Sequence, residues 1–293
     1  MASNPVFNRF NEDLAKGRYV GEQQPQYGQQ GYGQSYLGVR QGGHLSQQGG
    51  YPVPDREKMH RVSVASLDAA GRLTLDDVII KMLPLFGTLL VCAAIGWLVA
   101  DGHPGEGTAL WLGSLVVGLV VGLVISLKRI VSVPLILTYA VCEGLFVGAA
   151  SSFFNSVYNG VVIEVVLTTL CVFAGMFVGW KIGLIKVTER SRKIFVLMVM
   201  GYLLFALVNV VLVRTGVFHN LFGVGGTGLL GIIISIFAVS LASYSIAVDF
   251  DTIQRCVDFG LPEKYSWLMA HGLLVSVVWL YIELLRLFAR MRN

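Results

Sequence analysis

The hydrophobic pattern of this 293-residue chain is a polar N-terminal stretch followed by long apolar runs. Each run is close to the roughly 20 residues that an α-helix needs to cross the hydrocarbon layer of a membrane. The pattern predicts seven membrane-spanning helices, at about residues 82–100, 108–127, 131–154, 160–182, 194–213, 228–250 and 266–288. We therefore expect an all-α polytopic membrane domain over residues 82–293.

The composition agrees with this interpretation, because apolar residues make up 55% of the chain and charged residues only 14%. Soluble domains carry about 25% charged residues. Such a chain cannot cover its surface with polar groups, so we expect the lipid bilayer to be its solvent. The net charge of +4 comes from basic residues in short loops, which is typical of membrane topology and gives no reason to expect a nucleic-acid partner. The four cysteines have neither CxxC spacing nor nearby histidines, and we interpret them as packing residues.

Two segments precede the first predicted span. Residues 1–55 are rich in Gln, Gly and Tyr and poor in branched aliphatic residues, a composition typical of a disordered tail. Residues 56–81 form a juxtamembrane segment in which Thr74, followed three residues later by Asp77, resembles a helix capping box. We expect a short interfacial helix there, leading into the first span.

The charged residues between the predicted spans alternate in sign. Asp101 and Glu106 follow the first span, whereas basic clusters precede it and follow the second and fourth spans. The positive-inside rule then places the N-terminus in the cytoplasm of a plasma-membrane protein, and seven crossings place the C-terminus outside. Three arginines at the C-terminal end disagree with an external C-terminus, because basic residues are usually sparse on that side of the membrane. They are Arg286, Arg290 and Arg292. Either the last segment does not cross fully, or these arginines pair inside the bundle.

Two carboxylates, Asp249 and Asp251, end the sixth apolar run. A charge at the bilayer centre costs roughly 2.5–3.5 kcal/mol, so an acid in a membrane helix is a candidate functional residue. Because residues two apart on a helix point to nearly opposite faces, one acid should face the bundle interior and the other the interface or a loop. The alternative is that both acids simply mark where the helix leaves the membrane.

Further polar residues lie within the third and seventh predicted spans. Glu143 is followed by small residues that let neighbouring helices approach, so it is either a neutral buried acid or part of an ion pathway. Glu283 shares a helical face with Arg286, which can neutralise it. Alternatively, one residue of the last span faces the acid at the end of the sixth: Glu283, Ser276 or His271. Two carboxylates in contact would share a proton and act as a pH switch.

Several short motifs, in their order on a seven-helix frame, resemble the transmembrane Bax inhibitor motif family. They are FDT at 250–252 with Gln254, LYIELLRLF in the last span, EGL at 143–145, and the segments SNPVF and LTLDDVIIK, which look like those of actinobacterial members. The resemblance implies a seven-helix fold in which the last helix is surrounded by the other six. It also implies a pH-sensitive calcium leak.

The resemblance further implies a gate made of paired aspartates on the sixth and seventh helices and an arginine from the second. The sixth-helix aspartate corresponds to Asp251, and the arginine would fall at Lys128 or Arg129. If the motif of the last span is matched to that of the family, Glu283 is the partner of Asp251, but the loop before the span must then be longer than in the family. If the sequence is aligned to the family without a gap, Ser276 takes the position of the seventh-helix aspartate. We take Glu283 as the partner, and expect these two acids to be the ligands of a weakly held, permeating Ca²⁺ ion.

Two functions are compatible with these residues. The first is a proton-modulated cation leak, because two or three carboxylates supply fewer oxygens than the about six to eight of a tight Ca²⁺ site, which suits conduction. The second is a non-catalytic regulator that binds another membrane protein, such as a quality-control protease, through glycine-rich helix faces and the N-terminal tail. No enzyme is predicted, since the chain lacks GxSxG and HExxH, and no cofactor is expected apart from Ca²⁺ as the permeant ion.

Overall fold

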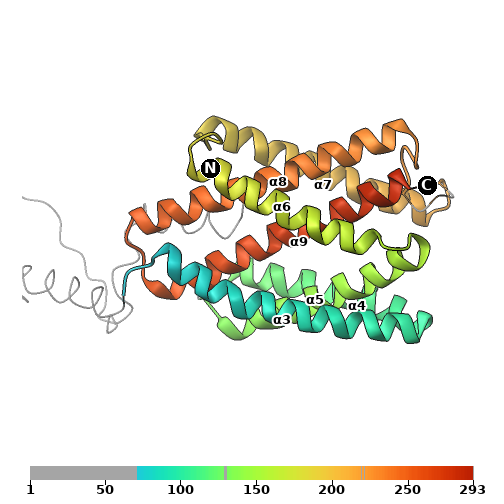
Figure 1. Cartoon of the computed structure of the whole chain (residues 1–293), viewed down its shortest axis with the longest axis horizontal. Coiled ribbons are helices and arrows are strands. Elements are labelled where there is room, and N and C mark those ends of the chain that lie inside the picture. Colours follow the sequence, from blue (N-terminus) through green and yellow to red (C-terminus); the bar gives the residue numbers. More distant parts are fainter. Residues whose placement is uncertain (1–70, 129–130, 219, 221, 293) are drawn as a thin grey trace, which may run out of the picture.

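The computed structural model describes residues 71–128, 131–218, 220 and 222–292. These residues form seven helices that are long and apolar enough to cross a membrane, which confirms the predicted fold class (Figure 1). In chain order they are α3 (Leu75–Gly102), α4 (Pro104–Leu127), α5 (Val133–Val157), α6 (Val161–Lys181), α7 (Glu189–Arg214), α8 (Leu229–Asp258) and α9 (Ser266–Met291), with the 3₁₀ turn η1 (Glu263–Tyr265) before α9. The predicted tail, residues 1–55, and most of the juxtamembrane segment lie outside the described residues.

The first span, α3, begins at the capping box that the sequence indicates. Thr74 Oγ1 accepts a hydrogen bond from the Asp77 backbone N–H at 3.2 Å, and Asp77 Oδ2 accepts one from the Thr74 backbone N–H at 2.9 Å. These bonds satisfy backbone donors at the start of the helix. The residues expected to form a separate interfacial helix are the first turns of α3, because no helix-breaking loop separates them from the apolar run.

The residues just before α3 pair with the turn between α8 and α9. The Leu73 backbone N–H donates to the Leu261 carbonyl at 2.7 Å, and the Glu263 backbone N–H donates to the Gly71 carbonyl at 3.2 Å. Backbone groups outside helices need partners of this kind when they are shielded from water. The start of α3 is therefore fixed beside the α8–α9 turn.

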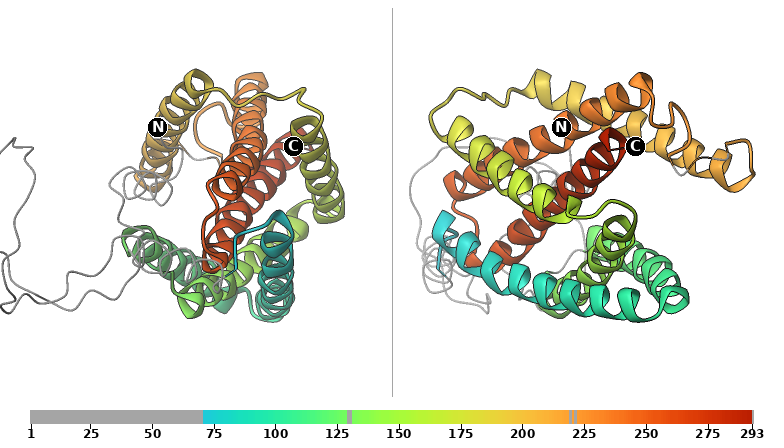
Figure 2. Two further views of the ribbon diagram at one scale, coloured as in Figure 1. Left: turned by 90° about the vertical axis from the view of Figure 1, so that its left-hand side faces the viewer. Right: turned by 45° about the vertical axis from the view of Figure 1, so that its right-hand side comes forward.

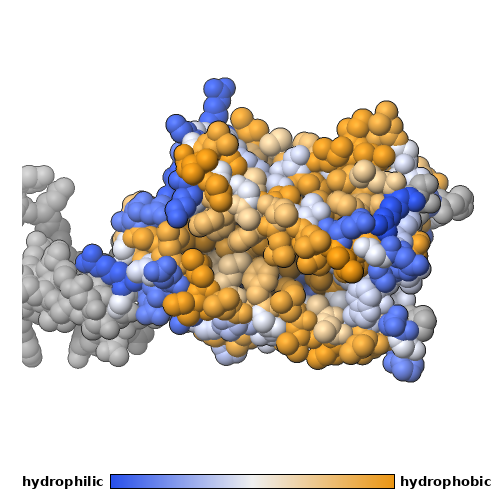
Figure 3. Space-filling model, in the orientation of Figure 1, coloured by the Kyte–Doolittle hydropathy of each residue, from blue (hydrophilic) through white to orange (hydrophobic). Residues whose placement is uncertain are grey.

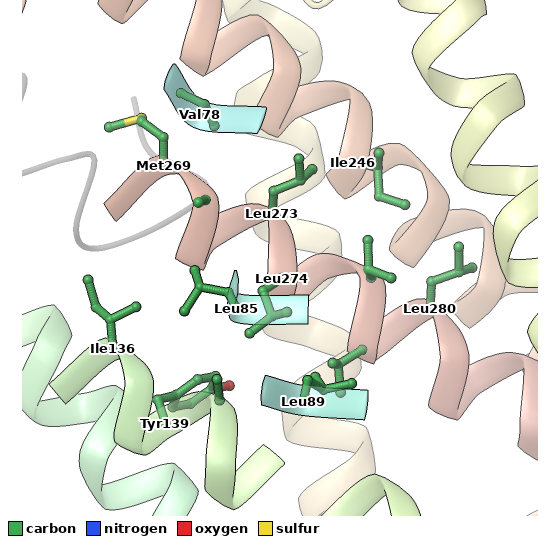
Figure 4. Close-up of a cluster of buried hydrophobic side chains, with 14 of the residues drawn as sticks. Val78, Leu85, Leu89, Ile136, Tyr139, Ile246, Met269, Leu273, Leu274 and Leu280 are labelled. Carbon is green, nitrogen blue, oxygen red and sulfur yellow. The ribbon is translucent and has the colours of Figure 1, made fainter. Parts of the chain in front are cut away.

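The last helix, α9, runs through the middle of the bundle, as predicted (Figure 2). In its most apolar stretch 83% of the residues are buried, compared with 6% in α7. Figure 4 shows the buried cluster to which Leu273, Leu274 and Leu280 of α9 contribute, together with Leu85 and Leu89 of α3. The buried polar side chains of α9 consequently lie against other helices and not against lipid, where they would be costly.

Helices α3 and α5 approach each other closely because small residues lie between them. A Cβ atom added to Gly144 of α5 would lie 2.5 Å from the carbonyl oxygen of Leu89, and one added to Gly96 of α3 would lie 2.6 Å from that of Leu145. Larger side chains at these positions would push the two backbones apart. The small residues after Glu143 therefore serve helix packing.

Apolar side chains cover the sides of the helices, and polar residues gather at the two ends of the bundle (Figure 3). Leu98 of α3, Ile163 of α6 and Leu197 of α7 are 71%, 69% and 72% exposed. Soluble proteins rarely expose large continuous apolar surfaces. The chain is a multi-pass membrane protein whose sides face lipid.

The arginines at the end of α9 are paired with other groups of the bundle, which is one of the two alternatives that their position left open. Arg290 donates to Ser235 Oγ at 3.0 Å, and Arg292 forms an ion pair with Glu164 at 2.6 Å. Arg286 is likewise engaged by groups of α7 and α9. The 26 residues of α9 span about 39 Å, enough for a full crossing.

Candidate functional site

Asp251 lies in the last two turns of α8 and faces the start of α7. Its Oδ2 atom accepts hydrogen bonds from two guanidinium groups, Nη2 of Arg192 in the first turn of α7 and, at 2.8 Å, Nε of Arg255 one turn further along α8. Arg255 Nη1 also pairs with Glu189 of α7 at 2.7 Å. These four side chains form one charged cluster that joins the two helices, here called the α7–α8 clasp.

Arg192 is the most buried member of the clasp. Its side chain is 5% exposed, whereas that of Asp251 is 20% exposed. Within the described part of the chain, Asp251 is the carboxylate that forms an ion pair with Arg192, and Arg192 Nε has no hydrogen-bond partner. A buried charge is stable only when a countercharge and hydrogen bonds compensate it. Arg192 therefore depends on the negatively charged form of Asp251.

The start of α7 is positioned by its own local sequence. Thr188 and Ser191 form a capping box, in which the Ser191 backbone N–H donates to Thr188 Oγ1 at 3.1 Å. Tyr244 of α8 donates a hydrogen bond from its hydroxyl to Ser191 Oγ at 2.8 Å. The helix consequently begins beside α8, and the next residue, Arg192, is directed toward that helix.

Asp249 points toward α9, away from the clasp. The residue is 7% exposed, and its Oδ2 atom accepts a hydrogen bond from Ser276 Oγ. The spacing of two residues separates Asp249 and Asp251 onto different faces of α8, as expected for a helix. One acid thus contacts the central helix, and the other joins α8 to α7.

Glu283 of α9 has a different set of partners. Its Oε1 atom accepts hydrogen bonds from the Tyr202 hydroxyl of α7 at 2.6 Å and from Trp279 Nε1 at 3.2 Å. Arg286 Nη1 lies 3.4 Å from the same oxygen and donates to the Tyr202 hydroxyl at 3.2 Å. Glu283 is 4% exposed. The sequence offers neutralisation by Arg286 as the simpler explanation of this buried acid, and the structure contains that ion pair.

The structure brings Ser276, and not Glu283, to an acid of α8. Asp251 lies seven residues before the end of α8, and Glu283 lies 17 residues after the start of α9. A helix rises 1.5 Å per residue, so in two helices that run in opposite directions these positions are offset by about 15 Å. Asp249 and Ser276 lie nine and ten residues from the same turn and are therefore level.

His271 and Glu143 belong to a second polar contact, between α5 and α9. The Tyr139 hydroxyl donates to Glu143 Oε1 at 2.5 Å, and the Tyr139 ring packs edge-on against His271 with the ring centroids 4.6 Å apart. His271 is 6% exposed, and its Nδ1 atom has no hydrogen-bond partner among the residues that the structure describes. This contact joins α5 to the central helix at a place separate from the clasp.

The basic partner of Asp251 is not one of the two candidates that the resemblance suggested. Lys128 is exposed at the end of α4, and Arg129 lies outside the described residues. Arg192 of α7 supplies the guanidinium group. The hydrophobic pattern alone does not identify Arg192 as the partner of Asp251, because the pattern places Arg192 among the basic residues after the fourth span, which indicate only topology. Its place in the first turn of an apolar helix is the signal that it needs a partner.

The predicted Ca²⁺ ligands are not arranged as a metal site in this conformation. Within residues 71–128, 131–218, 220 and 222–292, no three His, Cys, Asp or Glu side chains are placed to hold a metal ion together. Asp251 binds guanidinium groups, and Asp249 binds a serine hydroxyl. In this conformation the acids of α8 hold helices together.

Seven membrane-length helices around a buried last helix, with acids of α8 and α9 turned toward protein, define a polytopic α-helical membrane protein with an ionisable interior. The family model described as Bax inhibitor 1 like matches residues 4–293, and the chain belongs to this family. The match confirms the family suggested by the motifs. Among curated proteins, none matches the chain.

Proposed function

We propose that the protein is a pH-sensitive cation leak with Ca²⁺ as its permeant ion, and that the α7–α8 clasp holds it closed. Membership of the Bax inhibitor family supports the class of protein. The observation that carries the gating role is the contact of Asp251 with the buried Arg192 of a different helix. An ion pair that joins two helices and depends on one carboxylate is an element that a proton can switch.

Protonation of Asp251 removes the countercharge of Arg192 and leaves a buried guanidinium group unpaired. Such a loss costs about 3–5 kcal/mol. Separation of α7 from α8 relieves the cost, because water then reaches Arg192. Glu189 does not replace Asp251, since its side chain is 57% exposed and already pairs with Arg255. Acidification therefore opens the leak, and a higher pH closes it.

Asp249 and Ser276 are placed to meet a cation once the helices separate. Their oxygens face each other between α8 and the central helix. Carboxylate and hydroxyl oxygens suit a hard cation, but two side chains supply far fewer than the about six to eight oxygens of a tight Ca²⁺ site. The ion would consequently pass weakly held and partly hydrated.

We assign the end of the bundle that carries the clasp to the cytoplasmic side of the plasma membrane. Among the described residues, that end carries Lys128 and Lys186 in loops and Arg190 in the first turn of α7. At the opposite end, Arg290 and Arg292 are paired with groups of the bundle. Unpaired basic loops favour the cytoplasmic side. The clasp would then respond to cytoplasmic pH.

Calcium flux into liposomes, measured over a pH series, tests this function. Flux through the wild-type protein should rise on acidification. Asp251→Asn removes the titrating carboxylate, so its flux should be high and independent of pH. Asp258→Asn is the matched control, because Asp258 lies on the same helix, is exposed and accepts a hydrogen bond from Gln254. The same pH dependence in Asp251→Asn and in the wild type would contradict the proposal.

The same preparations distinguish the leak from the second candidate, a non-catalytic regulator of another membrane protein such as a quality-control protease. A leak keeps its flux when residues 1–55 are deleted. If neither the wild type nor Asp251→Asn conducts cations, the leak is rejected. Crosslinking from residues 1–55 in native membranes then becomes the experiment that identifies a partner.

A further inference from the structure

A groove runs along one side of the bundle, between α3 and α6. It consists of two hollows with volumes of about 740 and 630 Å³. Both are lined by Phe86 of α3, Thr169 and Leu170 of α6, and Val277 of α9, so α9 forms the floor where they meet. Figure 3 shows the depression on this face, surrounded by apolar side chains.

The groove opens toward lipid. Its rim includes Leu83 and Leu90 of α3 and Leu170 of α6, which are 68%, 62% and 60% exposed. In a membrane protein such side chains contact hydrocarbon. An unfilled hollow would deprive its lining of dispersion contacts, and the apolar molecule available at this place is an acyl chain.

Each hollow has the length of one membrane leaflet. The first extends along α3 from Leu75 to Phe86, and the second extends from Phe86 to Leu98. At 1.5 Å per residue, each is about 17 Å long. This is close to half of the hydrocarbon layer of about 30 Å. Each hollow therefore accommodates a chain from one leaflet.

Charged residues line the first hollow and not the second. Asp76 of α3 and Lys181 of α6 lie at its end, with Gln254 of α8. Lys181 Nζ lies 5.8 Å from the centroid of the Phe177 ring, and among the described residues no carboxylate forms an ion pair with it. A cation and an anion at the mouth of an acyl-sized hollow complement a headgroup that carries both charges.

We propose that this hollow binds a zwitterionic glycerophospholipid with a primary ammonium group, of the phosphatidylethanolamine class. One acyl chain lies between α3 and α6, the phosphate faces Lys181, and the ammonium group faces Asp76. The chain also contacts Phe250, which lines the hollow between the two aspartates of α8 and packs against Phe177 at 5.1 Å between ring centroids. The site is independent of the proposed leak.

Native mass spectrometry tests the headgroup contacts. The protein is reconstituted in vesicles of equal parts phosphatidylethanolamine and phosphatidylglycerol with identical acyl chains, then released into mild detergent. The wild type should retain phosphatidylethanolamine preferentially. Lys181→Gln should lower that retention about tenfold, as expected for one charge-assisted contact. Lys186→Gln, an exposed lysine outside the hollow, should leave it unchanged.

Asp76→Asn tests the contact with the ammonium group separately from the contact with the phosphate. It should remove the preference for phosphatidylethanolamine over phosphatidylglycerol without lowering the total lipid retained, because the contact of Lys181 with phosphate remains. Equal retention in Lys181→Gln and Lys186→Gln, or a wild type without headgroup preference, would overturn the proposal.

A variant that fills the groove tests the acyl chain separately from the headgroup. Leu170→Trp places a larger side chain in the groove at a position that is 60% exposed, and Leu197→Trp is its control on α7, 72% exposed and outside the groove. The first variant should retain several-fold less phospholipid than the second, with equal helix content by circular dichroism. Equal retention in both would place the lipid elsewhere.

Discussion

Asp251 and Glu283 both pair with an arginine and both contact α7, yet they hold the molecule in different ways. The buried arginine that binds Asp251 comes from α7, whereas the arginine of Glu283 lies three residues further along its own helix. The side chain of Asp251 is 20% exposed and that of Glu283 is 5% exposed. An ion pair between helices is lost when the helices separate, whereas one within a helix can persist. This difference is the reason for assigning the switch to Asp251.

The largest effect is expected for Asp251→Asn. The substitution leaves Arg192 buried without a countercharge, so the free energy of unfolding should fall by about 3–5 kcal/mol. Denaturant unfolding in mild detergent, followed by intrinsic fluorescence, measures it. A loss below about 1 kcal/mol, the range of a surface ion pair, would mean that Arg192 does not depend on Asp251.

Glu283→Gln should have a smaller effect, about 1–3 kcal/mol, because hydrogen bonds to a charged acceptor become bonds to a neutral one. The amide oxygen still accepts from Tyr202, and Arg286 reaches solvent with its side chain 40% exposed. The pH dependence of calcium flux should not change. A shifted pH profile in this variant would move the switch from the clasp to α9.

The double variant Asp251→Asn with Arg192→Met should recover stability to within about 1 kcal/mol of the wild type, because a buried ion pair can be replaced by neutral groups of similar size at little cost. Its flux should nevertheless be insensitive to pH, since no carboxylate remains at position 251. Unfolding and flux measured on the same preparation separate the two properties. Failure to recover stability would indicate that Arg192 has another essential partner.

The smallest effect is expected for Arg255→Gln. Its side chain is 41% exposed, so its ion pairs with Asp251 and Glu189 are partly solvated and should contribute about 0–1 kcal/mol. The unfolding experiment described for Asp251→Asn measures this change as well. A loss as large as that of Asp251→Asn would make Arg255, and not Arg192, the main member of the clasp.

The seven spans, the capping box at Thr74 and the central position of the last helix could be predicted from the sequence. Spans follow from the length of apolar runs, and a cap depends on residues three apart. The central position of α9 came from the resemblance, and it agrees with the cost of exposing Ser276 and Glu283 to lipid. The structure confirms the fold class.

The partners of the acids could not be predicted in the same way. Whether α7 or α4 lies beside the end of α8 depends on how the helices pack, which no local pattern records. The choice of Glu283 over Ser276 relied on the similarity of a short motif. Counting the helical rise from the α8–α9 turn favours Ser276 over Glu283 as a contact of α8 and places it level with Asp249, because contacts across a hairpin are set by equal distances from its turn.

The hydrogen bonds of Gly71 and Leu73 to the α8–α9 turn have a mechanical consequence. They fix residues 71–73, which precede α3, to the hairpin that carries Asp251 and Ser276. A force applied to the chain at Gly71 is therefore transmitted to this hairpin before it reaches α3. It does not have to travel along the first span.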